Sequence, residues 1–174
     1  MMHYPLDSLK YTPDTEFFFS EGKYKGEYLP NCGVIATSLA TNIPYMEVRE
    51  AYAENKRKPN AWKGRLFEWE VDNCLIRLSK AHGFDIEKCT DYQPFGVRVV
   101  EFAELHSRTG QSYILHVCGH FLAVKNGWIG DQYGIEHYTR WKTHHRYGRN
   151  SLAKEVWIIE NGGVSTPVAF DLLA

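Results

Sequence analysis

Residues 112–131, SYILHVCGHFLAVKNGWIGD, decide the fold that this sequence predicts. The run is rich in β-branched, aromatic and other apolar residues, and Asn126-Gly127 interrupts it near its end. Asn-Gly favours a two-residue hairpin, because a type I′ turn needs a positive φ at both central residues. The stretch therefore predicts one long strand over 112–124, a tight turn, and an antiparallel strand after it.

The turn also predicts which residues of the two strands face one another. A two-residue loop at 126–127 pairs Lys125 with Trp128, and every further pair keeps the same index sum. Because side chains alternate between the faces of a sheet, His120 and Asp131 share one face as diagonal neighbours, about 7–8 Å apart at the backbone. The hairpin thus predicts a histidine and a carboxylate within side-chain reach. A surface pair or a satisfied core group is the alternative.

A second pattern lies upstream, in residues 28–48, YLPNCGVIATSLATNIPYMEV. Apolar residues recur at helical spacing from Cys32 to about Thr41, and Asn31 is suited to cap the start of this helix. A helix N-terminus favours the thiolate over the thiol, and the thiolate is the nucleophile. The position of Cys32 indicates a reactive thiol, although buried helix cysteines that only fill a core are common.

The remaining pattern changes from helices to strands along the chain. Further helices are expected over 45–54, 66–82 and 98–107, and a last strand over 155–160. Helices first and an antiparallel sheet afterwards predict an α+β fold in a single domain. We expect four parts: an irregular N-terminal arm (1–30), a mainly helical region (31–110), the antiparallel sheet (111–162) and a tail (163–174).

Composition is ordinary for one globular domain, with 174 residues, 44% hydrophobic and 24% charged. The net charge of −1 gives no overall attraction to nucleic acid or acidic membranes. No run approaches the ~20 apolar residues of a membrane span, and the N-terminus lacks the features of a signal peptide. A cytoplasmic protein without membrane attachment is expected, with its four cysteines as free thiols because no CxxC pair occurs.

Cys32, His120 and Asp131 together suit nucleophilic catalysis. A neighbouring imidazolium favours the thiolate and later protonates the leaving group. A carboxylate on the other ring nitrogen orients the histidine. We expect these three residues to act together, in this order along the chain.

The two stretches resemble the papain-like cysteine peptidases. NCGVIATSLAT (31–41) looks like their nucleophile helix, and 112–131 looks like their histidine strand, turn and following Asp or Asn strand. The combination is similar to small uncharacterised papain-like proteins of phages and bacteria, in which a Cys-initiated helix precedes a GHxxAVxxGxxxD hairpin. The resemblance implies a helical layer packed on a sheet, with the active site between them. It also implies a thiol hydrolase that cleaves a peptide or isopeptide bond in a protein substrate, without a cofactor.

The oxyanion hole departs from the family pattern. These peptidases usually carry a glutamine some six residues before the cysteine, where this chain has Gly26. Asn31 or the backbone N–H of Cys32 is expected to supply the donor instead. The resemblance further implies an aromatic shield over the His–Asp pair, for which Trp128 and Tyr133 are the candidates.

A zinc site is an alternative interpretation of HVCGH (116–120). On one continuous strand, His116, Cys118 and His120 would share a face, with His137 opposite in an extended hairpin. This spacing is not common in zinc sites, so we expect no metal.

Other functions stay open beside the hydrolase. The same triad could transfer an acyl group to an amine or cleave a peptidoglycan-type amide. A different class is a non-enzymatic binding module, since residues 56–65 and 140–149 interleave cations and rings in a way that can bind nucleic acid. Solvated loops are the interpretation that we favour for both segments.

Overall fold

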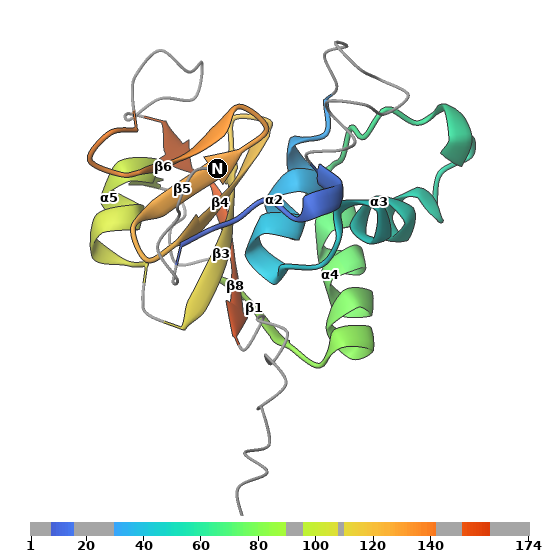
Figure 1. Ribbon diagram of the computed structural model, residues 1–174, viewed down its shortest axis with the longest axis horizontal. Helices are drawn as coiled ribbons and strands as arrows, with labels where there is room; N and C mark the ends of the chain where they lie inside the picture. The colour runs from blue at the N-terminus through green and yellow to red at the C-terminus, as the bar shows by residue number, and fades with distance from the viewer. Residues whose placement is uncertain (1–7, 16–29, 90–95, 108–109, 142–150, 161–174) are drawn as a thin grey trace, which may run out of the picture.

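The computed structural model describes residues 8–15, 30–89, 96–107, 110–141 and 151–160 of the chain (Figure 1). The predicted α+β class is confirmed, because N-terminal helices pack on a C-terminal, six-stranded antiparallel sheet. No helix among the described residues is both long enough and apolar enough to span a membrane.

The predicted helices all form within a few residues of their expected bounds. The helix that Cys32 begins is buried along almost its whole length, as its small and apolar side chains allow. Gly83 ends the longest helix in the left-handed conformation (φ 72°), which glycine adopts without steric cost. The helices are α2 (Cys32–Thr41), α3 (Tyr45–Ala53), α4 (Glu68–His82) and α5 (Val99–Leu105), with a 3₁₀ helix η1 (Pro59–Ala61).

The main sheet has the strand order β1-β8-β3-β4-β5-β6, with every neighbouring pair antiparallel. The last strand expected from the sequence, 155–160, forms as β8, an interior strand between β1 and β3. The strands of this sheet are β1 (Asp85–Cys89), β3 (Gln111–Val117), β4 (His120–Lys125), β5 (Trp128–Asp131), β6 (Gly134–His137) and β8 (Glu155–Glu160). A separate pair is formed by β2 (Val97–Arg98) and β7 (Leu152–Ala153).

The predicted single strand over 112–124 is wrong, because the chain turns at Cys118-Gly119. Both residues have positive φ, 48° and 79°, so they form a second tight hairpin turn between β3 and β4. The sequence pattern does not predict this turn, because apolar residues flank it on both sides and cysteine is not a typical turn former. The hairpin at 126–127 has the predicted register, with Lys125 opposite Trp128.

Two hydrophobic clusters cover the two faces of the sheet. One contains α2, α3 and α4 against one face, and it is the larger cluster. The other contains α5 and the opposite face. Figure 1 shows α5 on one side of the strands and α2 to α4 on the other. The expected helical layer is therefore confirmed for three helices, whereas α5 packs on the far face.

The described part of the N-terminal arm, residues 8–15, packs on the fold. Leu9 is buried in the larger cluster. The Asp14 carboxylate accepts hydrogen bonds from the backbone N–H groups of Tyr45 (3.0 Å) and Met46 (2.8 Å). Asp14 thus satisfies two N–H groups at the start of α3 that have no partner within the helix. The rest of the predicted arm and the predicted tail (163–174) lie outside the described residues.

Candidate active site

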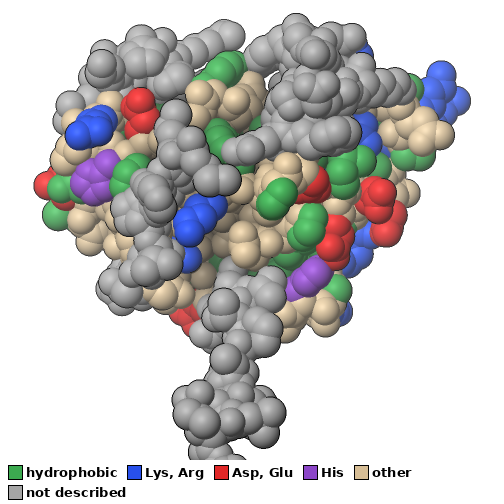
Figure 2. Space-filling view, viewed as in Figure 1, with side chains coloured by type: hydrophobic (Ala, Val, Ile, Leu, Met, Phe, Trp, Pro, Cys, Tyr) green, Lys and Arg blue, Asp and Glu red, His purple; other side chains and the backbone are tan. Residues whose placement is uncertain are grey.

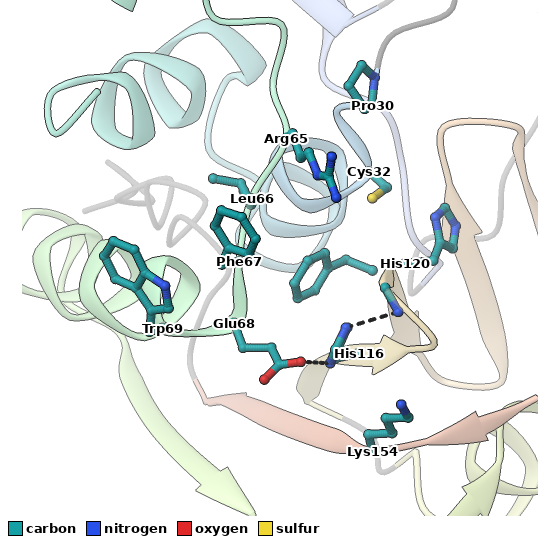
Figure 3. A pocket seen from close by; sticks show the side chains of 12 residues that line it. Pro30, Cys32, Arg65, Leu66, Phe67, Glu68, Trp69, His116, His120 and Lys154 are labelled. Carbon is teal, nitrogen blue, oxygen red and sulfur yellow. Dashed lines mark hydrogen bonds and ion pairs between the residues drawn. The ribbon is translucent and has the colours of Figure 1, made fainter. Parts of the chain in front are cut away.

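A cleft of about 760 Å³ lies between the helical layer and the β3–β4 hairpin (Figure 3). Cys32 lines it from the start of α2, and His120 lines it from the start of β4. The segment before α4 adds the exposed aromatic ring of Phe67 and the side chain of Arg65. The two predicted reactive residues therefore meet at one cleft.

His120 is held by the predicted carboxylate. Its Nε2 lies 2.9 Å from Oδ2 of Asp131, and both side chains are buried. The second carboxylate oxygen, Oδ1, accepts a hydrogen bond from the Tyr133 N–H at 2.7 Å. The Tyr11 hydroxyl donates to the backbone carbonyl of Asp131. Three contacts therefore hold Asp131 in place, and Asp131 in turn orients the His120 ring.

The pKa of His120 is raised from its ordinary 6.5 to about 9. Burial is the largest influence and lowers this pKa, since it disfavours the charged ring. Hydrogen bonds to Asp131 and Cys32, together with their charges, act in the other direction and outweigh burial. The ring is therefore protonated at neutral pH, with the Asp131 carboxylate and the Cys32 sulfur as its neighbours.

Cys32 is the first residue of α2 and is half-buried. Backbone N–H groups of a first helical turn have no partner inside the helix, and they carry partial positive charge. Figure 3 shows the Cys32 and His120 side chains on the same part of the cleft wall. The sulfur of Cys32 thus lies where the start of α2 meets the His120 ring.

Asn31 does not line the cleft. Its Nδ2 donates to the Tyr45 hydroxyl at 2.9 Å, and its side chain makes no capping hydrogen bond. Asn31 is the N-cap residue of α2, as predicted, and its backbone carbonyl accepts from the Ile35 N–H at 3.1 Å, but its side chain takes no part in the cap. An oxyanion role for Asn31 stays a prediction, and Gly26 lies outside the described residues. An oxyanion role for the Cys32 N–H, at the start of α2, stays a prediction as well.

Tyr133 lies beside the His–Asp pair. Its ring centroid is 6.3 Å from that of His120, and its N–H holds Asp131. The other candidate shield, Trp128, packs edge-on against His137 instead, at 5.4 Å. Tyr133, rather than Trp128, is thus the aromatic residue beside this pair, although 52% of its surface is exposed.

The zinc alternative over HVCGH is wrong, because the hairpin turn separates its members. His116 pairs with Phe121 and His120 pairs with Val117, so the two histidines leave the hairpin on opposite faces. Cys118 is exposed on the turn itself. His137 lies opposite Trp128 on β6. These side chains do not converge on one point.

The basic segment 56–65 is a mostly exposed connection around η1. Lys56 forms an ion pair with Glu70 and lies 5.1 Å from the centre of the Trp62 ring, so its charge is engaged within the protein. On the face drawn in Figure 2, basic and acidic side chains of the described residues are interspersed. Most of the other segment, 142–149, lies outside the described residues, and Trp141 beside it is buried.

Sequence reasoning missed several residues at the site. Tyr11 comes from the N-terminal arm, where no periodic pattern exists. Phe67 and Trp69 line the cleft although both are exposed. Their exposure, unusual for large aromatic side chains, is visible only in three dimensions.

Comparison of the chain with protein-family models, curated proteins and solved structures found no match.

Proposed function

We propose that this protein is a papain-like thiol hydrolase that cleaves a peptide or isopeptide bond with Cys32, His120 and Asp131. The observation that carries the proposal is the state of His120. Its ring hydrogen-bonds to Asp131 and interacts with the Cys32 thiol at a cleft, and its pKa of about 9 keeps it protonated at neutral pH. A thiolate–imidazolium pair is the reactive form of such enzymes.

In the proposed mechanism, the Cys32 thiolate attacks the carbonyl carbon of the scissile bond. The backbone N–H of Cys32, at the start of α2, stabilises the oxyanion. His120 gives its proton to the leaving amine, which leaves a thioester on Cys32. His120 then takes a proton from water, whose oxygen attacks the thioester and releases the acid product. Asp131 keeps the ring oriented through both steps.

The walls of the cleft support a peptide substrate. Phe67 and Trp69 expose more than half of their surface beside the proposed nucleophile. Exposed aromatic rings at a cleft offer apolar contact area to side chains of a bound peptide. A protein or peptide substrate therefore fits the cleft better than a small, fully enclosed ligand. We expect the protein in the cytoplasm, where its free thiols stay reduced.

The first test is the rate of Cys32 alkylation by iodoacetamide from pH 4 to 9, measured by mass spectrometry. In the wild type we expect rapid alkylation well below pH 8.5, the usual midpoint of a free thiol. In His120→Ala the profile should move to higher pH and the rate at neutral pH should fall. The exposed Cys118 is an internal control whose profile should not change. Identical Cys32 profiles in both proteins would contradict the proposal.

Product analysis separates the hydrolase from other uses of the same triad. A peptide library digested with and without an added primary amine distinguishes hydrolysis from acyl transfer, because transfer gives the amide product. Peptidoglycan fragments test the amidase alternative. A Cys32 that is inert in every assay, together with salt-sensitive binding to DNA or RNA, would favour a binding module instead.

A further inference from the structure

Three potential metal ligands from three elements converge at the edge of the cleft, on the side of the hairpin away from His120, and two of them, Glu68 and His116, line it. Glu68 begins α4, His116 lies on β3, and Glu155 is opposite His116 on β8. One ligand atom from each of these residues lies within 4.8 Å of the other two. Figure 3 shows the Glu68 carboxylate and the His116 ring pointing toward each other.

Two of these atoms are buried and have no hydrogen-bond partner. They are Nδ1 of His116 and Oε2 of Glu155. Nδ1 lies 2.9 Å from Oε1 of Glu68 and 3.6 Å from Oε2 of Glu155, but neither contact forms an aligned hydrogen bond. The His116 side chain is only 7% exposed, so water does not replace the missing partner freely. Buried polar atoms without partners are rare, and they call for a ligand that satisfies them.

Neighbouring residues orient these ligands. The Phe121 ring stacks on His116 with centroids 4.9 Å apart. Lys88 holds the other Glu155 oxygen, Oε1, at 2.9 Å, which leaves Oε2 directed toward His116. In metal sites, contacts of this kind from residues behind the ligands fix the orientation of the ligands.

We propose that Glu68, His116 and Glu155 bind a divalent cation of the zinc class. One imidazole nitrogen with two carboxylates suits zinc, whereas magnesium and calcium prefer oxygen ligands alone. The Glu68 side chain is half exposed, so a fourth position opens to the cleft for water. Because the ligands come from α4 and from the sheet, the bound ion links the two layers across the cleft. The proposal does not depend on the thiol chemistry of Cys32.

The metal-free protein carries its His116 proton on Nδ1. The Gly119 N–H donates to Nε2 at 3.2 Å, so Nε2 acts as the acceptor. A metal on Nδ1 displaces this proton. The neutral ring then carries its proton on Nε2, which faces the Gly119 N–H and can no longer accept its hydrogen bond. Metal binding therefore changes the tautomer of His116 and weakens this one hydrogen bond at the hairpin turn.

Untagged protein treated with a chelator is the sample for the test. We would titrate it with Zn²⁺ by calorimetry and with Co²⁺ by absorption spectroscopy. We expect one ion per chain and a Co²⁺ spectrum without a sulfur-to-metal charge-transfer band. Long-range ¹⁵N–¹H spectra should show the His116 proton on Nδ1 before Zn²⁺ is added and on Nε2 afterwards.

Matched variants locate the ion. Glu68→Gln and Glu155→Gln keep the size of each side chain, and each should weaken Zn²⁺ binding at least tenfold. Cys32→Ser and Cys118→Ser should bind as the wild type does, which separates this site from the proposed catalytic thiol. Thermal unfolding without metal confirms that each variant folds, and added Zn²⁺ should raise the Tm of Cys32→Ser but not that of Glu68→Gln.

Three results would overturn the proposal. The first is the absence of stoichiometric Zn²⁺ binding to the wild type. The second is binding that both glutamine variants retain in full, which would show an adventitious ion elsewhere. The third is binding that Cys32→Ser abolishes, which would assign the ion to the thiol. The first two results do not bear on whether Cys32 is a nucleophile, and the alkylation profile of Cys32 tests that proposal separately.

Discussion

Two histidines on either side of one turn behave in opposite ways. His116 and His120 are both buried, and each has a ring nitrogen 2.9 Å from a carboxylate oxygen. The pKa of His120 is nevertheless raised to about 9, whereas the pKa of His116 is lowered below its ordinary 6.5. A short distance to a carboxylate therefore does not by itself keep a histidine charged.

The difference comes from alignment and from neighbours. Burial is the largest influence on both rings and lowers both pKa values. At His120 it is outweighed by an aligned hydrogen bond to the fully buried Asp131 and by the Cys32 sulfur. At His116 the Glu68 carboxylate is half exposed to solvent, and the Lys154 cation opposes a second positive charge. One hairpin thus carries a charged ring and a neutral ring.

The largest expected effect is on kcat/KM, which should depend on His120 far more than on His116. If the proposed function is right, His120→Ala lowers kcat/KM by on the order of 10³-fold, since it removes the general acid and base. His116→Gln, the matched change on the other side of the turn, should alter kcat/KM only a few-fold. The measurement is peptide hydrolysis with a substrate found by library profiling. Equal losses in both variants would show that the hairpin as a whole, rather than His120, matters.

The next effect is on stability against pH. His120 binds its proton more tightly in the folded state, so its contribution is full below pH 6.5 and is lost as the pH rises to about 9. At about 1.4 kcal/mol per pKa unit, the contribution is about 3 kcal/mol. His116 acts with the opposite sign, because its lowered pKa costs stability as the pH falls below 6.5.

Urea unfolding of chelator-treated protein between pH 5 and pH 10 measures both contributions. His120→Gln should flatten the alkaline part of the profile, whereas His116→Gln should flatten the acidic part. An unchanged alkaline slope in His120→Gln would refute the raised pKa.

Asp131→Asn tests the aligned hydrogen bond. The amide oxygen still accepts a hydrogen bond from His120 but has no charge, so the pKa of His120 should fall by roughly one unit or more. NMR titration of the ring measures this change. Glu68→Gln is the matched change at His116, and it should move that pKa less because the carboxylate is half exposed. A larger shift at His116 would show that exposure to solvent does not weaken the influence of Glu68 on this ring.

The smallest effect concerns the turn that separates the rings. Gly119 has φ 79° and open space around the position of a Cβ, so Gly119→Ala should cost about 1 kcal/mol through backbone strain alone. Gly110→Ala is the control, since Gly110 has φ 83° and equally open surroundings. The two free energies of unfolding should fall equally, but only Gly119→Ala should alter the pH profile of Cys32 alkylation. If Gly110→Ala changes the alkylation profile as well, the change follows from lost stability and not from the position of Gly119.

Features that depend on local chemistry were predictable from the amino-acid sequence. Helical spacing after Asn31 predicted that Cys32 begins a helix, and Asn126-Gly127 predicted the register that joins His120 to Asp131. These predictions succeed because turn residues and side-chain alternation act over a few positions.

Tertiary structure decided the features that depend on packing between distant segments. The turn at Cys118-Gly119 lies within an apolar run that gives no turn signal. The Asn31 amide donates a hydrogen bond to the Tyr45 hydroxyl and not to the start of α2. Glu68, His116 and Glu155 come together only because α4 packs beside β3 and β8. No local pattern records such contacts, since their partners are separated along the chain and are joined by burial of apolar surface.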